Sequence, residues 1–107
     1  MGRAYGLAPV LLLLMACQGR NDKVFHANFD AIPIGAPETE VISKLGPPDY
    51  TGPEFHLSQL AGYQQRYDEA ARSGSVRYHS WHREIDVTCT VGIDSKGRVA
   101  CKACGGT

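Results

Sequence analysis

The chain has 107 residues, and its 11 lysine and arginine side chains balance 11 aspartate and glutamate side chains, so the formal net charge is zero. This balance argues against nucleic acid as a partner, because nucleic-acid-binding domains carry an excess of basic residues. The length allows one small domain with a thin core rather than two domains.

The N-terminal segment has the features of a secretion signal. Arg3 precedes an apolar run from Leu7 to Ala16, which at about ten residues is half the length needed to span a bilayer. Within it, Leu14-Met15-Ala16-Cys17 resembles the lipobox of bacterial lipoprotein precursors. That resemblance implies removal of residues 1–16 and makes Cys17, carrying a diacylglycerol and an N-acyl chain, the first mature residue. An ordinary secretory signal with an incidental cysteine is the alternative.

The residues after the cysteine indicate a location and a tether. Gln18 follows Cys17, whereas an Asp at that position favours inner-membrane retention in many lipoproteins. The resemblance therefore implies the outer membrane, with the protein facing the periplasm. Residues 18–30 are polar and lack helical or strand periodicity, so we expect residues 17–31 to form a lipidated flexible tether and residues 32–107 to form the domain.

Two amphipathic helices are predicted next. Pro37 can begin a helix, Val41, Ile42 and Leu45 share one face, and Gly46 can end it. A second helix is predicted from Phe55 to Ser73. Its apolar stripe is read as core packing and consists of Phe55, Leu60, Tyr63, Tyr67 and Ala71.

From Ser75 onward the pattern changes to that of strands. Every odd position from Ile85 to Ile93 is apolar, which predicts a strand with one buried face. Asp94-Ser95-Lys96-Gly97 fits a three-residue hairpin turn, in which Ile93 would face Val99 and Val91 would face Cys101. A weaker strand is predicted for residues 75–81. The expected fold is α+β, with two helices on a three-stranded antiparallel sheet.

This arrangement behind a lipobox resembles a known family. The segments Ile34-Gly35, Glu40-Val41, Leu45-Gly46-Pro47-Pro48 and Val91 to Val99 are similar to the BamE (SmpA/OmlA) lipoprotein domain and its relatives, such as the osmotically inducible lipoprotein OsmE. The resemblance implies a non-enzymatic envelope lipoprotein that binds a protein partner in outer-membrane protein assembly or integrity. It implies no small-molecule substrate and no cofactor beyond the lipid on Cys17.

Three cysteines remain after lipidation of Cys17, and an oxidising compartment favours a disulfide between two of them. The expected hairpin register places Cys89 and Cys101 on one face, which predicts a Cys89–Cys101 bridge; Cys89–Cys104 is the alternative. Cys101-Lys102-Ala103-Cys104 could instead be a redox motif. A zinc site is a further alternative, with ligands drawn from Cys89, Cys101, Cys104 and either His79 or His82.

The residues do not support a hydrolase. Ser80 lies between His79 and His82 on an expected strand, without the sharp turn that exposes a nucleophile, and the two histidines should point to opposite faces. Asp68 and Glu69 are adjacent on a helix and cannot face each other as an acid–base pair. We therefore expect no catalytic residues and no metal site.

Overall fold

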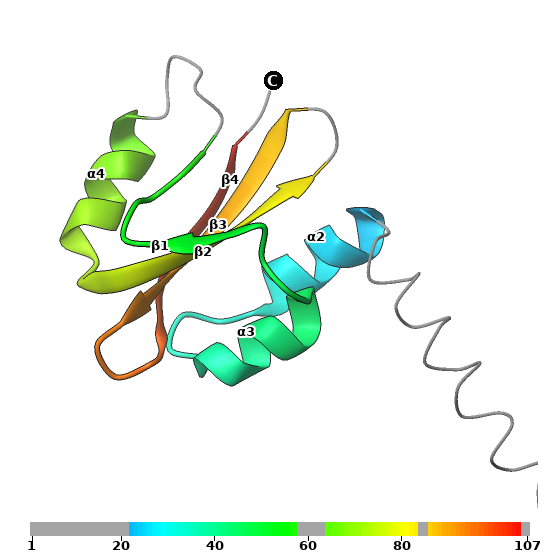
Figure 1. Cartoon of the computed structure of the whole chain (residues 1–107), viewed down its shortest axis with the longest axis horizontal. Helices are drawn as coiled ribbons and strands as arrows, with labels where there is room; N and C mark the ends of the chain where they lie inside the picture. The colour runs from blue at the N-terminus through cyan, green and yellow to red at the C-terminus, as the bar shows by residue number, and fades with distance from the viewer. Residues whose placement is uncertain (1–21, 58–63, 84–85, 106–107) are drawn as a thin grey trace, which may run out of the picture.

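The computed structural model describes residues 22–57, 64–83 and 86–105. Within these ranges the chain forms an α+β fold of three helices and a four-stranded antiparallel sheet (Figure 1). The elements in chain order are α2 (Asp22–Ala31), α3 (Glu38–Leu45), β1 (Tyr50–Gly52), α4 (Gln64–Arg72), β2 (Ser75–Arg83), β3 (Val87–Asp94) and β4 (Val99–Gly105). The signal and lipobox residues, Cys17 included, lie outside the described residues.

The sheet is a meander in the order β1-β2-β3-β4 and separates two helical layers. Helices α2 and α3 cover one face, and α4 packs on the other, where the Tyr78 hydroxyl donates to the carbonyl of Ala70 at 3.3 Å (Figure 1). The expected sheet of three strands lacked β1. That strand has three residues between Pro48 and Pro53, too few to show a period of two, and it is recognisable only by its pairing with β2.

Helix α2 contradicts the expected flexible tether over residues 22–31, and residues 17–21 of that expected tether lie outside the described residues. Phe25 and Phe29 are 2% and 3% exposed and pack into the core with Ile32. These residues stand at positions i, i+4 and i+7, which is one face of a helix. The prediction of a tether is wrong because polar residues surround this short stripe. The segment is therefore polar on average, although one of its faces is apolar. The folded domain therefore includes α2 and does not begin at Ile32, as was expected.

Helix α3 begins and ends at the residues that the sequence predicts. Pro37 is its N-cap residue, and Gly46 ends it with a φ of 82°, a conformation that favours glycine. Val41 and Leu45 are buried and Ile42 packs partly against them. This helix therefore closes the core on the α2 side of the sheet.

The second expected helix, residues 55–73, is only partly correct. Helix α4 includes Gln64–Arg72, and residues 58–63 lie outside the described residues. Phe55 is not helical; its ring contacts the rings of Tyr67 and Tyr78 at centroid distances of 5.0 and 5.6 Å. Phe55 and Tyr67 do pack together, as expected, but Phe55 reaches Tyr67 from the segment before α4 rather than from the same helix. Within α4, Ala70 is buried and Ala71 is exposed.

Strand β3 is buried on both faces. The odd residues Cys89, Val91 and Ile93 have no exposed surface and form the core under α2 and α3. The alternation predicted by the sequence is thus confirmed for this face. Thr90, on the other face, is also fully buried, and its hydroxyl donates to the carbonyl of His56 and bonds the Ser80 hydroxyl at 2.7 Å. Hydroxyl groups can be buried when each has such hydrogen-bond partners. The polar Thr90 face of β3 is therefore buried rather than exposed to solvent.

The β3–β4 hairpin has the predicted turn but a different register beyond it. Ile93 pairs with Val99 as expected, and the Gly97 N–H donates to the carbonyl of Asp94 at 3.0 Å. A bulge follows: Gly92 pairs with Cys101, so Ala100 is the extra residue. Because a shift of one residue turns every later side chain to the opposite face, Val91 faces Lys102 rather than Cys101.

Candidate functional site

The bulge decides which cysteines meet. Cys104 lies directly opposite Cys89, with Cα atoms 4.0 Å apart, and the two form a disulfide. The predicted Cys89–Cys101 bridge is therefore wrong, and the alternative Cys89–Cys104 is the one present. Cys101 keeps a free thiol on the α4 face, where its Sγ lies 3.6 Å from the Ser75 Oγ.

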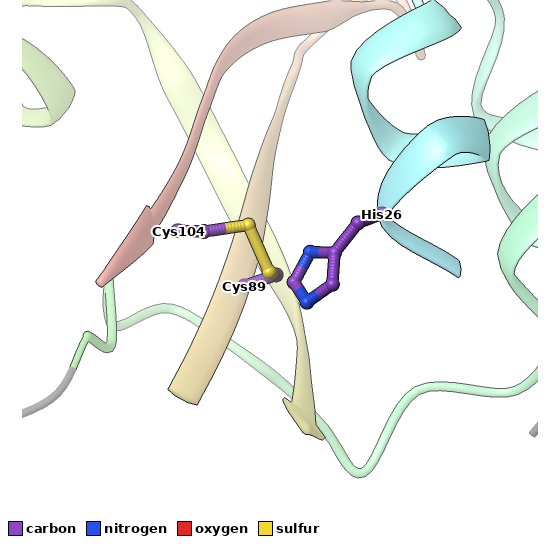
Figure 2. A group of neighbouring side chains, drawn as sticks. All are labelled: His26, Cys89 and Cys104. Atoms are coloured by element: carbon purple, nitrogen blue, oxygen red, sulfur yellow. A yellow bond between two sulfur atoms is a disulfide. The ribbon is translucent and has the colours of Figure 1, made fainter. Parts of the chain in front are cut away.

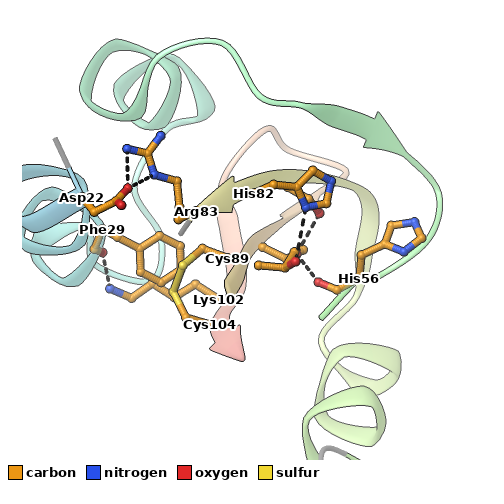
Figure 3. Close-up of a disulfide and its surroundings, with 11 residues drawn as sticks. Asp22, Phe29, His56, His82, Arg83, Cys89, Lys102 and Cys104 are labelled. Atoms are coloured by element: carbon orange, nitrogen blue, oxygen red, sulfur yellow. Dashed lines mark hydrogen bonds and ion pairs between the residues drawn. A yellow bond between two sulfur atoms is a disulfide. The ribbon is translucent and has the colours of Figure 1, made fainter. Parts of the chain in front are cut away.

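The two halves of the disulfide have different environments. Cys89 is fully buried in the core, whereas Cys104 lies on the edge strand β4 and is exposed. An external thiol can therefore reach the Cys104 sulfur more easily than the Cys89 sulfur. The bridge joins β3 to β4 beside α2 (Figure 3).

Polar contacts fix both ends of α2 over this bridge. Arg83 Nε donates to Asp22 Oδ1 at 2.8 Å at the start of the helix. Lys102 Nζ donates to the carbonyls of Phe29 and Asp30, at 2.6 and 3.1 Å, at its end (Figure 3). A lysine at a helix C-terminus interacts favourably with the last carbonyls and the helix dipole. The helix is thereby attached to β2 at one end and to β4 at the other.

His26 brings a third possible metal ligand to the disulfide. A ring nitrogen of His26 and the sulfurs of Cys89 and Cys104 all lie within 4.8 Å of one another (Figure 2). Sequence reasoning missed this residue because it lies in the segment interpreted as a tether. The signal that could have found it is its place in the Phe25–Phe29 helical turn, which directs that part of the helix toward the sheet.

The other proposed ligand set is not assembled. Cys101 lies on the opposite face of β4 from Cys104, which also separates the thiols of the proposed redox motif. His79 bonds Glu38 and Thr51, and His82 bonds the Thr88 hydroxyl at 3.3 Å. These partners lie on opposite sides of the sheet, as expected for the two histidines. Ser80 is fully buried and bonds Thr90, so its hydroxyl is not presented to solvent.

A second polar cluster surrounds Glu38 at the start of α3. Arg77 donates to both carboxylate oxygens of Glu38, through Nε at 2.8 Å and through Nη2. His79 Nε2 lies 2.5 Å from the same carboxylate, and its Nδ1 lies 2.7 Å from the Thr51 hydroxyl. The hydrogen bonds from Arg77, followed by that from His79, lower the pKa of Glu38 to about 2.

This cluster has the order hydroxyl, imidazole, carboxylate, which acyl-transfer enzymes use for nucleophile, base and orienting group. Its contacts here join three elements, since Thr51 is on β1, His79 on β2 and Glu38 on α3. The Arg77 fork also engages the carboxylate from the strand. The arrangement therefore holds α3 against the sheet through an ionised glutamate.

No protein-family model, curated protein or solved structure matches this chain. In the part of the chain that the structure describes, no helix is long and apolar enough to cross a membrane.

Proposed function

We propose that this chain is a periplasm-facing outer-membrane lipoprotein that acts as a non-enzymatic interaction module in envelope or outer-membrane protein assembly. The lipobox-like residues Leu14 to Cys17 and the resemblance to the BamE (SmpA/OmlA) domain support this proposal. The Cys89–Cys104 disulfide agrees with it, because disulfides persist in oxidising compartments such as the periplasm. Diacylation of one cysteine holds a protein stably at a membrane, whereas one acyl chain does not.

A lipid on Cys17 would restrict the orientation of the domain relative to the membrane. Four residues, 18–21, separate Cys17 from Asp22, and even a fully extended segment of that length reaches at most about 18 Å. The first turn of α2 would therefore stay close to the membrane surface. Asp22 is paired with Arg83 at the end of β2, so this end of the sheet would face the membrane as well.

Among the described residues, two of the three exposed large apolar side chains lie at the opposite end of the sheet, and this observation carries the proposal; the third, Val24 in the first turn of α2, is less exposed, at 40%. Val76, next to the Ser75–Asp94 pair, is 53% exposed. Ile34 is 60% exposed and precedes Gly35, whose N–H donates to the carbonyl of Val99 at 2.8 Å. Since β2 rises about 3.3 Å per residue, Ser75 lies about 26 Å from Arg83. Figure 1 shows the β3–β4 turn on the far side of the sheet from the start of α2.

The domain would thus present apolar residues to a partner on the side away from its anchor. Exposed apolar side chains lower the cost of dehydration when a protein partner covers them. A charged ligand is not favoured by a near-neutral chain, and the expected partner is a protein of the envelope. Enrichment of the β-barrel assembly complex would favour a role close to that of BamE, and another envelope protein would favour a related module with a different role.

Site-specific photo-crosslinking in the native envelope tests the proposal. A photoreactive residue at Ile34 or at Val76 should crosslink to the same envelope protein. The matched control position is Lys23, which is exposed but lies at the anchored end and should not give that product. Cys17→Ala should release the domain from the membrane or leave an uncleaved precursor. The proposal fails if the Ala variant still fractionates with the outer membrane or if the three positions crosslink alike.

A further inference from the structure

We infer that reduction of the Cys89–Cys104 disulfide converts this corner of the domain into a zinc-binding site, with His26 as the third protein ligand. The three ligands come from three different elements: His26 from α2, Cys89 from β3 and Cys104 from β4. Figure 2 shows the His26 ring beside the Cys89 sulfur, and it shows the disulfide bond between the Cys89 and Cys104 sulfurs. Two thiolates and one imidazole are a ligand set that Zn²⁺ prefers.

The three donor atoms lie close enough to one another to surround one tetrahedral ion. Zinc–sulfur bonds of about 2.3 Å and zinc–nitrogen bonds of about 2.0–2.1 Å place tetrahedral ligand atoms about 3.5–3.8 Å from one another. The three donor atoms already lie within 4.8 Å of one another. The two sulfurs are 2.00 Å apart while bonded and must separate when reduced. Rotation of the Cys104 side chain can supply this separation, because that residue is exposed on an edge strand.

The fold holds the histidine in place independently of the disulfide. Helix α2 remains attached to the sheet by the Arg83–Asp22 ion pair and by Lys102. Phe25 and Phe29, on either side of His26 in the helix, are buried in the core. The Phe25 ring also meets the His26 ring edge to face, with centroids 5.7 Å apart. Reduction therefore leaves a third ligand positioned over the two thiols, and such preorganisation favours metal binding.

The chemistry balances in two steps. An external dithiol transfers two electrons and two protons to the Cys89–Cys104 bond, which breaks to give two thiols, and the dithiol becomes a disulfide. Zn²⁺ then binds both sulfurs as thiolates and His26 through a neutral ring nitrogen, releasing the two thiol protons to solvent. The two thiolate charges neutralise the ion beside buried Cys89. The exposed Cys104 side leaves a fourth position for water, as in zinc sites with three protein ligands.

The test is zinc binding by the full chain in detergent, with Zn²⁺ alone as the probe. The oxidised protein and the anaerobically reduced protein, freed of reductant, compete for Zn²⁺ against a chromophoric chelator. We expect one Zn²⁺ per reduced chain and none per oxidised chain. His26→Gln should weaken the affinity at least tenfold, and Cys104→Ser should abolish stoichiometric binding. Cys101→Ser, the matched control on the opposite face of β4, should bind as the parent does.

The inference is overturned if the reduced parent binds no stoichiometric Zn²⁺, or if His26→Gln binds as tightly as the parent. A loss caused by Cys101→Ser would also overturn it, because the site would then use another set of thiols. If reduction unfolds the domain, circular dichroism of each reduced sample detects the loss of structure. Zn²⁺ should then restore the parent fold but not that of Cys104→Ser, and failure to restore the parent would contradict the site.

Discussion

The change Cys104→Ser isolates the contribution of the disulfide to stability. Cys104 is exposed, so serine there adds no cavity and buries no hydroxyl, whereas any change at Cys89 would also disturb the core. The bridge closes a loop with a sequence separation of 15, and a loop of that size is worth about 3 kcal/mol of unfolding free energy. For a domain of this length, that loss lowers the melting temperature by about 12–24 °C.

The assay is urea unfolding and scanning calorimetry of the oxidised parent, Cys104→Ser and Cys101→Ser. Reduction of the parent should reproduce the loss seen in Cys104→Ser and should have no further effect on that variant. Cys101→Ser is the control, since its half-buried thiol forms no disulfide and serine can keep the hydrogen bond to Ser75, and it should cost less than about 1 kcal/mol. Alkylation of the oxidised parent should label Cys101 and leave Cys104 protected.

The opposite result would refute the register of the hairpin. If Cys101→Ser carries the large loss and Cys104 is the residue alkylated, then the strands pair without the bulge at Ala100. Cys101 would then share a face with Cys89, as the simple alternation in the sequence predicts.

Three other changes test the packing and the charge cluster. Thr90→Asp and Val91→Asp should each lower the unfolding free energy by more than about 2 kcal/mol, because both faces of β3 are buried; a wild-type melting temperature for Thr90→Asp would contradict this. Phe29→Ala should cost about 3–5 kcal/mol by urea unfolding, whereas a flexible tether would show no change. The ionised form of Glu38 is stabilised in the folded state, so its contribution is present above about pH 4.5 and is lost as pH falls toward 2. Solvent screening limits that contribution to about 1 kcal/mol, and Glu38→Gln should remove it from a plot of stability against pH.

Local signals in the sequence were sufficient for α3 and for the hairpin turn. Pro37 and Gly46 mark the ends of that helix through their own backbone preferences, and Asp94 and Gly97 do the same for the turn. Each of these features depends on residues within a few positions of one another. The α+β class and the alternating core face of β3 followed from the same kind of local pattern.

The features that the sequence did not predict depend on contacts between distant residues. The bulge at Ala100 leaves no mark in composition, yet it exchanges the faces of Cys101 and Cys104. Gly92 fits this arrangement, because a Cβ there would lie 2.7 Å from the Cys101 Sγ. Helix α2 has a local signal in the spacing of Phe25 and Phe29, but the surface that buries these two rings comes from the distant sheet.

The residues of the candidate sites also come from distant parts of the sequence. His26 becomes a ligand candidate only after α2 is placed over the disulfide. Glu38 and His79 are 41 positions apart in the chain and meet because α3 packs on β2. The sequence therefore identified the cysteines as candidate site residues, but it could not show which residues they contact in the fold.

Mass spectrometry of the intact mature protein, extracted from native envelopes without reductant, tests the central proposal most directly. Our account predicts a chain that begins at Cys17 and carries a diacylglycerol thioether and an N-acyl chain on that residue. An N-terminus elsewhere, or an unmodified Cys17, would contradict it.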